Sequence, residues 1–198
     1  MDTNFEKSQT KENLMRAFAG ESQARNRYTF AAEKAKEAKL HVIDAIFTFT
    51  AHQERAHAKV FYDFLKDEAG KNINIDGTYP VDIYEKIPEL LRAAQHNEFQ
   101  EYENDYKNFS KIAREEGFIG ISNTFNMIAE VEKTHGERFG QFADLLEQGK
   151  LFVSDFETSW ICLNCGHIYN GKEVPAVCPI CKHDKGFFIR VELSPYSK

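Results

Sequence analysis

The feature that most constrains this chain is the spacing Glu-x-x-His, which occurs twice inside segments with helical periodicity. Glu54 and His57 form the first pair, and Glu132 and His135 form the second. Residues three apart lie on one face of a helix, so a carboxylate and an imidazole at this spacing can hold one metal ion. A surface ion pair can use the same spacing. The surrounding pattern therefore has to decide between the two interpretations.

Four long segments carry apolar residues at the three- and four-residue spacing of helices that pack in a bundle. They cover about residues 8–38, 42–69, 88–116 and 118–148. Short joins near residues 39–41 and at Gly117 predict two antiparallel pairs. Residues 70–87 separate the second segment from the third and are long enough to be a crossover. The pattern predicts a mostly α-helical chain, with a four-helix bundle that has a long crossover between helices two and three.

Each of the four segments carries a glutamate near the middle of its apolar face, where an unpaired carboxylate is costly. These residues are Glu21, Glu54, Glu98 and Glu132, and Glu101, His57 and His135 follow one turn later on three of the faces. Two helices that give one Glu each and two that give Glu-x-x-His form the ligand set of di-iron and di-manganese bundles. The spacing predicts a two-metal site inside the bundle. Arg25 and Asp105 keep the seven-residue spacing and are expected beside these carboxylates.

The character of the sequence changes after Gly149, where cysteine, aromatic residues, Gly and Pro replace the helical pattern. We expect a bundle domain over residues 1–149 and a small metal domain over residues 150–198. The latter holds two C-x-x-C pairs, formed by Cys162, Cys165, Cys178 and Cys181. Two such pairs around a short loop predict a tetrahedral four-thiolate site for either iron or zinc. A domain this short needs the metal to hold its fold.

Composition argues against several classes of function. The net charge of −6 and the lack of a basic run argue against nucleic-acid binding. No apolar run reaches the roughly 18 residues of a membrane helix. The N-terminal residues are polar and contain no signal-peptide core. Because all four cysteines are also accounted for as metal ligands, we expect a cytoplasmic location and no membrane partner.

With these motifs in view, the chain resembles the rubrerythrin family, in which a ferritin-like di-iron bundle precedes a rubredoxin-like domain. The resemblance rests on AFAGESQARNRY (17–28), HQERAHAKVF (52–61), HNEFQEY (96–102), AEVEKTH (129–135) and the two cysteine motifs. It implies a non-haem peroxidase that reduces hydrogen peroxide to water in oxidative-stress defence. Electrons from a reduced pyridine nucleotide would pass through a separate rubredoxin or reductase and then through the rubredoxin-like iron.

The resemblance also implies roles for individual residues. The ligands of an oxo- and carboxylate-bridged iron pair would be Glu21, Glu54, His57, Glu98, Glu101, Glu132 and His135, with Glu54 and Glu132 bridging. Tyr28 and Tyr106 match tyrosines near the family's site. One iron would exchange His57 for Glu101 on oxidation, since a fifth carboxylate offsets the extra charge of two Fe(III). Lys182 stands where free rubredoxins usually have glycine, and a left-handed backbone there costs about 1 kcal/mol.

Two alternatives remain open from the sequence. A ferroxidase or iron-storage protein of the ferritin class would oxidise and retain iron, although it has no need of a four-thiolate site. Zinc in that site would instead make the tail a docking module. We also expect a homodimer or larger assembly that brings one subunit's cysteine domain near another's di-iron site. The reason is length, because the end of the last helix lies about 20 Å beyond His135.

Overall fold

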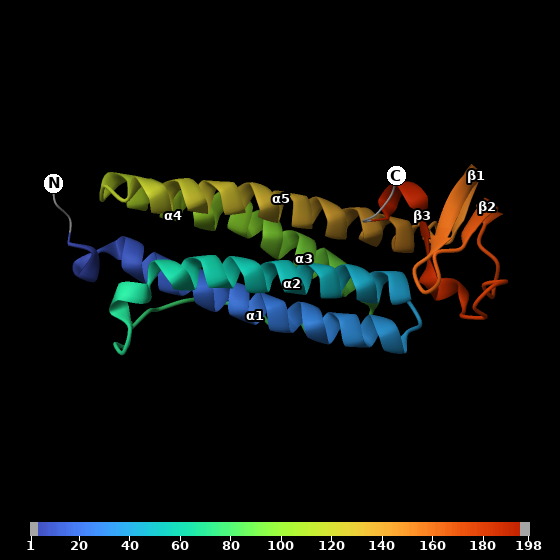
Figure 1. Cartoon of the computed structure of the whole chain (residues 1–198), viewed down its shortest axis with the longest axis horizontal. Helices are drawn as coiled ribbons and strands as arrows, with labels where there is room; N and C mark the ends of the chain where they lie inside the picture. The colour runs from blue at the N-terminus through green and yellow to red at the C-terminus, as the bar shows by residue number, and fades with distance from the viewer. Residues whose placement is uncertain (1–3, 195–198) are drawn as a thin grey trace.

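The computed structural model describes residues 4–194 and shows a long helical bundle with a small β domain at one end (Figure 1). The bundle contains α1 (Gln9–Glu37), α2 (His41–Phe64), α3 (Ile87–Gln100), α4 (Tyr106–Glu115) and α5 (Ile119–Glu147). A π-helical turn, Glu101–Asp105, joins α3 to α4, and the resulting rod packs against α5. Residues 69–86 form neither helix nor strand and connect the two helical pairs. The predicted four-helix bundle with one long crossover is confirmed.

The turns that follow α1, α4 and α5 share one geometry. A residue with a left-handed backbone follows each helix, and the next N–H bonds the carbonyl five residues earlier. The left-handed residues are Lys39, Gly117 and Gly149, with φ of 58°, 90° and 66°. This arrangement satisfies carbonyls that a helix end leaves without partners. The chain therefore reverses sharply after α1 and after α4, which makes the neighbouring helices antiparallel.

The third helical segment differs from the continuous helix that the sequence predicts over residues 88–116. The π-helical turn adds one residue, so the buried positions beyond it fall one residue later than the heptad spacing requires. Tyr106, Ser110 and Ala113 are buried, whereas Asp105 and Ile112, which continue the simple spacing, are only half-buried. The turn begins at Glu101, one of the predicted metal ligands. It therefore changes the direction of side chains at the site itself.

Two apolar clusters fill the bundle on either side of its middle. The cluster nearer the β domain contains Phe47, Leu91 and Phe139, and the cluster nearer the N-terminus contains Phe61 and Phe125. The carboxylates discussed below lie between them, with little access to water. Within the described residues, no helix has the length and apolar character needed to cross a membrane.

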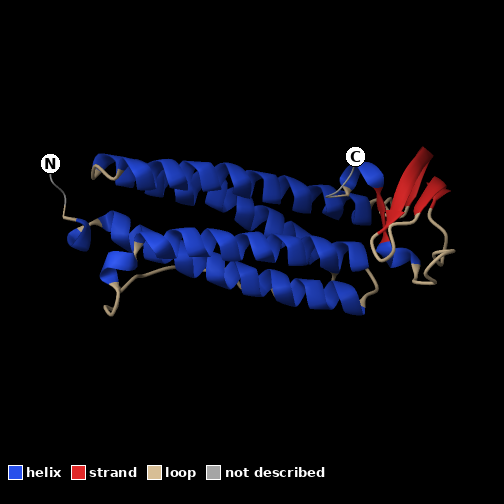
Figure 2. Ribbon diagram, in the orientation of Figure 1, coloured by secondary structure: helices blue, strands red, loops and turns tan. Residues whose placement is uncertain are grey.

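The β domain is a three-stranded antiparallel sheet in the order β2–β1–β3, formed by β1 (Val153–Cys162), β2 (Ile168–Glu173) and β3 (Phe188–Arg190) (Figure 2). Trp160 is fully buried in its core and donates from Nε1 to the carbonyl of Gly171 at 2.9 Å. The domain packs on the turn between α1 and α2. There the ring of His41 stacks on Phe187 with centroids 3.9 Å apart.

Candidate metal centres

Side chains from four helical segments meet in the middle of the bundle and form two groups of possible metal ligands. The first group contains Glu21, Glu54, His57 and Glu132, and the second contains Glu54, Glu98, Glu132 and His135. In each group the ligand atoms all lie within 4.8 Å of one another. The two groups share Glu54 and Glu132. The structure thus brings together all of the predicted bundle ligands except Glu101.

The shared carboxylates each present one oxygen to each imidazole. Glu54 places Oε2 3.3 Å from Nδ1 of His57 and Oε1 3.0 Å from Nδ1 of His135. Glu132 places Oε1 2.9 Å from Nδ1 of His57 and Oε2 2.7 Å from Nδ1 of His135. This is the geometry of two bridging carboxylates between two metal positions, because each position receives one oxygen from both residues.

The other two glutamates are each held by a tyrosine. The hydroxyl of Tyr106 donates to Oε1 of Glu21, and the hydroxyl of Tyr28 donates to Oε1 of Glu98. Oε2 of each glutamate remains buried without a hydrogen bond. The same is true of both oxygens of Glu54 and Glu132 and of Nδ1 of both histidines. Buried polar atoms are normally satisfied, so this concentration of unsatisfied oxygens and nitrogens around two centres fits a pair of cations.

In the metal-free cluster, the charges of neighbouring side chains shift one another's pKa values. Burial and the neighbouring carboxylates raise the pKa of Glu98 to about 8. Burial alone would lower the pKa of His57, but Glu132 and Glu54 raise it to about 9. Burial would raise the pKa of Glu54, yet the close imidazoles of His135 and His57 lower it to about 2. Without metal, the cluster therefore retains protons near neutral pH.

These shifts predict that the metal-free protein loses stability as pH rises from about 5 to 9. The pKa of Glu98 rises from 4.5 to about 8 on folding, and that of His57 rises from 6.5 to about 9. A group with a raised folded-state pKa stabilises the fold below its unfolded pKa, and this contribution is lost as pH rises through the folded value. The lowered pKa of Glu54 has the opposite effect on stability, but only at pH values below its ordinary pKa of 4.5. Thermal unfolding of chelator-treated protein, followed by circular dichroism, measures the slope. A metal-free protein that gains stability over this range would contradict the expectation.

Glu101 lies half-buried at the start of the π-helical turn and belongs to neither four-ligand group. It lines a cavity of about 280 Å³, together with Tyr106, Asp105 and residues of the crossover such as Tyr79. The cavity thus lies on the crossover side of the bundle, next to Tyr106, whose hydroxyl donates to Glu21. Asp105 lies at this rim, as expected.

The arginines that lie near the carboxylate cluster are Arg27 and Arg138, and not Arg25, which the sequence predicts. Arg25 is exposed and lines a surface pocket with His52 and Arg55, so the predicted place beside the carboxylates is wrong. Arg27 lies beside the cavity instead and pairs with Asp82 of the crossover. Arg138, one turn after His135, was missed. The sequence feature that could have identified Arg138 is its position three residues after His135.

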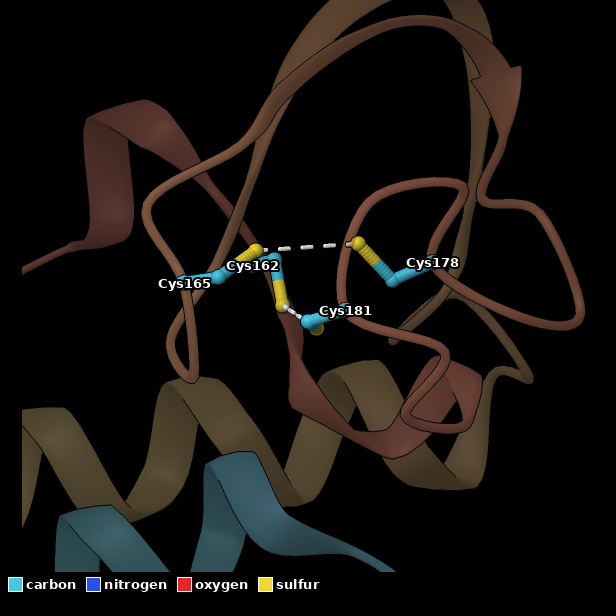
Figure 3. Close-up of side chains that lie close together, drawn as sticks. All are labelled: Cys162, Cys165, Cys178 and Cys181. Atoms are coloured by element: carbon cyan, nitrogen blue, oxygen red, sulfur yellow. Dashed lines mark hydrogen bonds between the residues drawn. The ribbon is translucent and has the colours of Figure 1, made fainter.

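The four cysteines converge from two loops of the β domain, above the end of the bundle (Figure 3). Sγ of Cys162 lies 3.8 Å from Sγ of Cys181, and Sγ of Cys165 lies 3.8 Å from Sγ of Cys178. Four sulfurs placed tetrahedrally at about 2.3 Å from a metal are about 3.8 Å apart, so the cage already has the size of a metal site.

The two cysteine loops repeat the same backbone pattern. The carbonyl of Cys162 accepts from the N–H of Gly166, and the carbonyl of Cys178 accepts from the N–H of Lys182. Both donors are left-handed, with φ of 75° at Gly166 and 65° at Lys182. Lys182 is thus a non-glycine residue with a left-handed backbone, and its Nζ donates to the carbonyl of Pro179 at 2.8 Å. A hydrogen bond from the main-chain N–H of His183 lowers the pKa of Cys181 to about 5, which favours the thiolate that binds metal.

Comparison with known proteins agrees with these two centres. Residues 12–143 match the family model "Rubrerythrin", and residues 160–189 match "Rubrerythrin, rubredoxin-like domain". The chain belongs to the rubrerythrin family. As a member, it has a di-iron site of carboxylate and histidine ligands and a C-terminal four-cysteine site of the rubredoxin type. The predicted fold class and cofactors are confirmed.

Individual members of the family are similar over almost their whole length. Rubrerythrin-1 of Clostridium acetobutylicum is 43% identical over 91% of this chain and 93% of its own. Rubrerythrin of Clostridium perfringens is 42% identical, also over 91% and 93%. Among solved structures, the fully reduced, all-ferrous state of nigerythrin is 27% identical, covers 96% of this chain and 93% of its own, and has a TM-score of 0.63.

Proposed function

We propose that this family member reduces hydrogen peroxide to water at the di-iron site, using electrons that arrive through the four-cysteine site. Each peroxide takes two electrons and two protons and leaves as two water molecules. The observation that carries the proposal is that Glu54 and Glu132 belong to both groups of possible ligands, in a chain that also contains a four-thiolate cage. Family membership supports an oxidoreductase in oxidative-stress defence.

We assign the di-iron ligands to Glu21, Glu54, His57, Glu98, Glu101, Glu132 and His135. A reduced iron pair held by these residues would supply the two electrons needed to reduce the O–O bond. Glu54 and Glu132 fix the two positions relative to each other. Tyr106 and Tyr28 hold Glu21 and Glu98 so that one oxygen of each points to the site.

The protein also controls access to the site. The apolar clusters around Phe61 and Phe139 exclude bulk water on both sides of the cluster. The cavity beside Glu101 is large enough for a peroxide molecule and lies next to polar groups that can orient it. Burial raises the pKa of the Glu101 carboxyl, which therefore can carry a proton toward the reacting oxygens.

Electron delivery completes the proposal. We assign Cys162, Cys165, Cys178 and Cys181 to one iron, which receives electrons from a separate rubredoxin or reductase linked to NAD(P)H. A homodimer would bring one subunit's cysteine site near another's di-iron site, and sedimentation at decreasing concentration measures that assembly. We also propose a boundary between residues 149 and 150 and a cytoplasmic location, where thiols stay reduced.

A steady-state assay tests the function. The iron-loaded protein, a rubredoxin, its reductase and NADH should consume peroxide catalytically, with one NADH oxidised per peroxide. Retention of many irons per chain without peroxide turnover would favour the ferroxidase or storage alternative. Stoichiometric zinc in the cysteine site after expression in ample iron would favour a docking role for the tail.

Replacing Glu101 by alanine is expected to raise the reduction potential of the di-iron site and to slow its reaction with peroxide. Glu101 is a fifth carboxylate, so its removal destabilises the more highly charged ferric state. The His57 side chain is 13% exposed and that of His135 is 0% exposed, so His57 has more room to exchange with Glu101. Redox titration and stopped-flow absorbance measure the two effects. Identical ligands in oxidised and reduced crystals, with an unchanged potential in E101A, would refute the exchange.

A further inference from the structure

Arg138 is a half-buried arginine whose hydrogen bonds go to neutral side chains. It lies on α5, one turn beyond His135, and reaches across to α2. Its Nη1 donates to Oγ1 of Thr50 at 3.0 Å and to Oε1 of Gln53 at 3.2 Å. Thr50 is fully buried, and Gln53 immediately precedes the bridging Glu54. The guanidinium is therefore fixed close to the metal ligands from two helices.

Two other arginines of the bundle have carboxylate partners. Arg27 pairs with Asp82, and Arg92 pairs with Asp144 at the surface. Within residues 4–194, no carboxylate lies close enough to Arg138 to form an ion pair. The positive charge of Arg138 is thus not cancelled locally and acts on its surroundings.

Arg138 lies on the side of the second ligand group, three residues after His135 on α5. Burial lowers the pKa of Arg138, whereas the negative charges of Glu98, Glu54 and Glu132 oppose that shift. Together with His135, these three residues are the second ligand group. On α2, Thr50 lies one turn before Glu54 and His57 lies one turn after it, so Arg138, bound to Thr50, lies away from His57 and on the His135 side of the shared carboxylate. The two metal positions are therefore electrostatically unequal.

We infer that Arg138 is a positioning residue whose fixed positive charge raises the reduction potential of the di-iron pair, and most strongly that of the iron held by His135. Uptake of one electron converts one Fe(III) to Fe(II) and removes one positive charge. A fixed cation nearby favours that change, and more so at the closer position. The first electron from the reduced carrier is therefore taken up by the iron at His135. This inference rests on the di-iron assignment. It adds the order in which the two irons are reduced.

The test compares Arg138→Gln with Arg138→Lys in iron-loaded protein. R138Q should lower the midpoint potential of the first reduction step, and should lower that of the second step less. R138K keeps the charge and should stay close to the wild-type potential. Arg92→Gln, which removes an arginine at the surface of the same bundle, is the matched control and should change neither step. Redox titration followed by electron paramagnetic resonance of the half-reduced form measures both steps.

A second variant covers the case in which R138Q does not fold or does not hold two irons. Gln53→Glu leaves the Arg138 guanidinium in place and gives it an anionic partner. The midpoint potential of the first reduction step should therefore fall in this variant too. Wild-type potentials in R138Q or, failing that, in Q53E would overturn the inference, as would equal shifts in R138Q and R138K. A wild-type protein that holds no iron pair would instead overturn the di-iron assignment on which the inference depends.

Discussion

Replacing Glu54 by alanine should empty both metal positions at once. Glu54 gives one oxygen to each ligand group, at 3.3 Å from His57 and 3.0 Å from His135. Without it, each position keeps three of its four ligands, and two close cations lose an anion that lies between them. We expect the iron content of the bundle to fall at both positions. Peroxide turnover should fall by more than about a hundredfold, since even the loss of an outer partner of a metal ligand costs 10–100-fold.

Matched variants make this expectation specific. Glu132→Ala removes the second shared carboxylate and should behave like E54A. Glu21→Ala removes a ligand of one group only and should leave one position able to bind. Glu130→Ala removes an exposed glutamate two residues before Glu132 and should change neither metal content nor turnover. Metal analysis and Mössbauer spectroscopy of each variant provide the measurement. An E54A protein that retains two irons would show that the two positions do not share this carboxylate.

Replacing Cys178 by alanine should abolish donor-driven turnover and leave the bundle site intact. Cys178 is fully buried, and its main chain pairs with His183 and Lys182 in the second cysteine loop. Loss of one thiolate removes the metal that holds this small domain together. We expect loss of its iron and a fall of more than about a hundredfold in turnover with NADH and carrier proteins. One chemically reduced turnover with peroxide should proceed as in wild type.

Lys182→Gly provides the control within the same loop. It should retain the iron and gain about 1 kcal/mol of stability, because glycine adopts the left-handed backbone without strain. Absorbance of the ferric four-thiolate site and rapid-mixing kinetics distinguish the two variants. Full NADH-driven turnover in C178A would show that electrons reach the di-iron site by another route.

Much of the bundle and its site follows from local sequence rules. Glu21, Glu54, Glu98 and Glu132 stand out because carboxylates on apolar helical faces need compensation, and that need is visible in the sequence without any structure. The crossover is equally visible, because residues 70–87 lack helical periodicity. The cysteine cage follows from two C-x-x-C motifs, since only a metal or a disulfide uses such spacing.

Other features depend on three-dimensional packing and could not be predicted in this way. The π-helical turn at Glu101 shifts the following residues by one, and nothing in the heptad spacing signals that shift. Arg25 and Arg138 both lie near ligands in the sequence, yet Arg138 on α5 turns inward toward α2, whereas Arg25 on α1 is exposed. The contact between Phe187 and His41 joins distant parts of the chain through shape, which no sequence pattern encodes.

Because the β domain docks on the turn between α1 and α2, the length of this helical hairpin determines the distance between the two metal sites of one chain. Gly186 approaches the carbonyl of Lys39 so closely that an added Cβ would lie 1.9 Å from that oxygen, which locks the domain to the tip of the hairpin. The spacing between the two redox centres of one chain is consequently set by the number of helical turns between Glu54 and that tip. Each extra turn would lengthen this distance within one chain by about 5.4 Å, so electron delivery would depend more on the cysteine site of a second subunit.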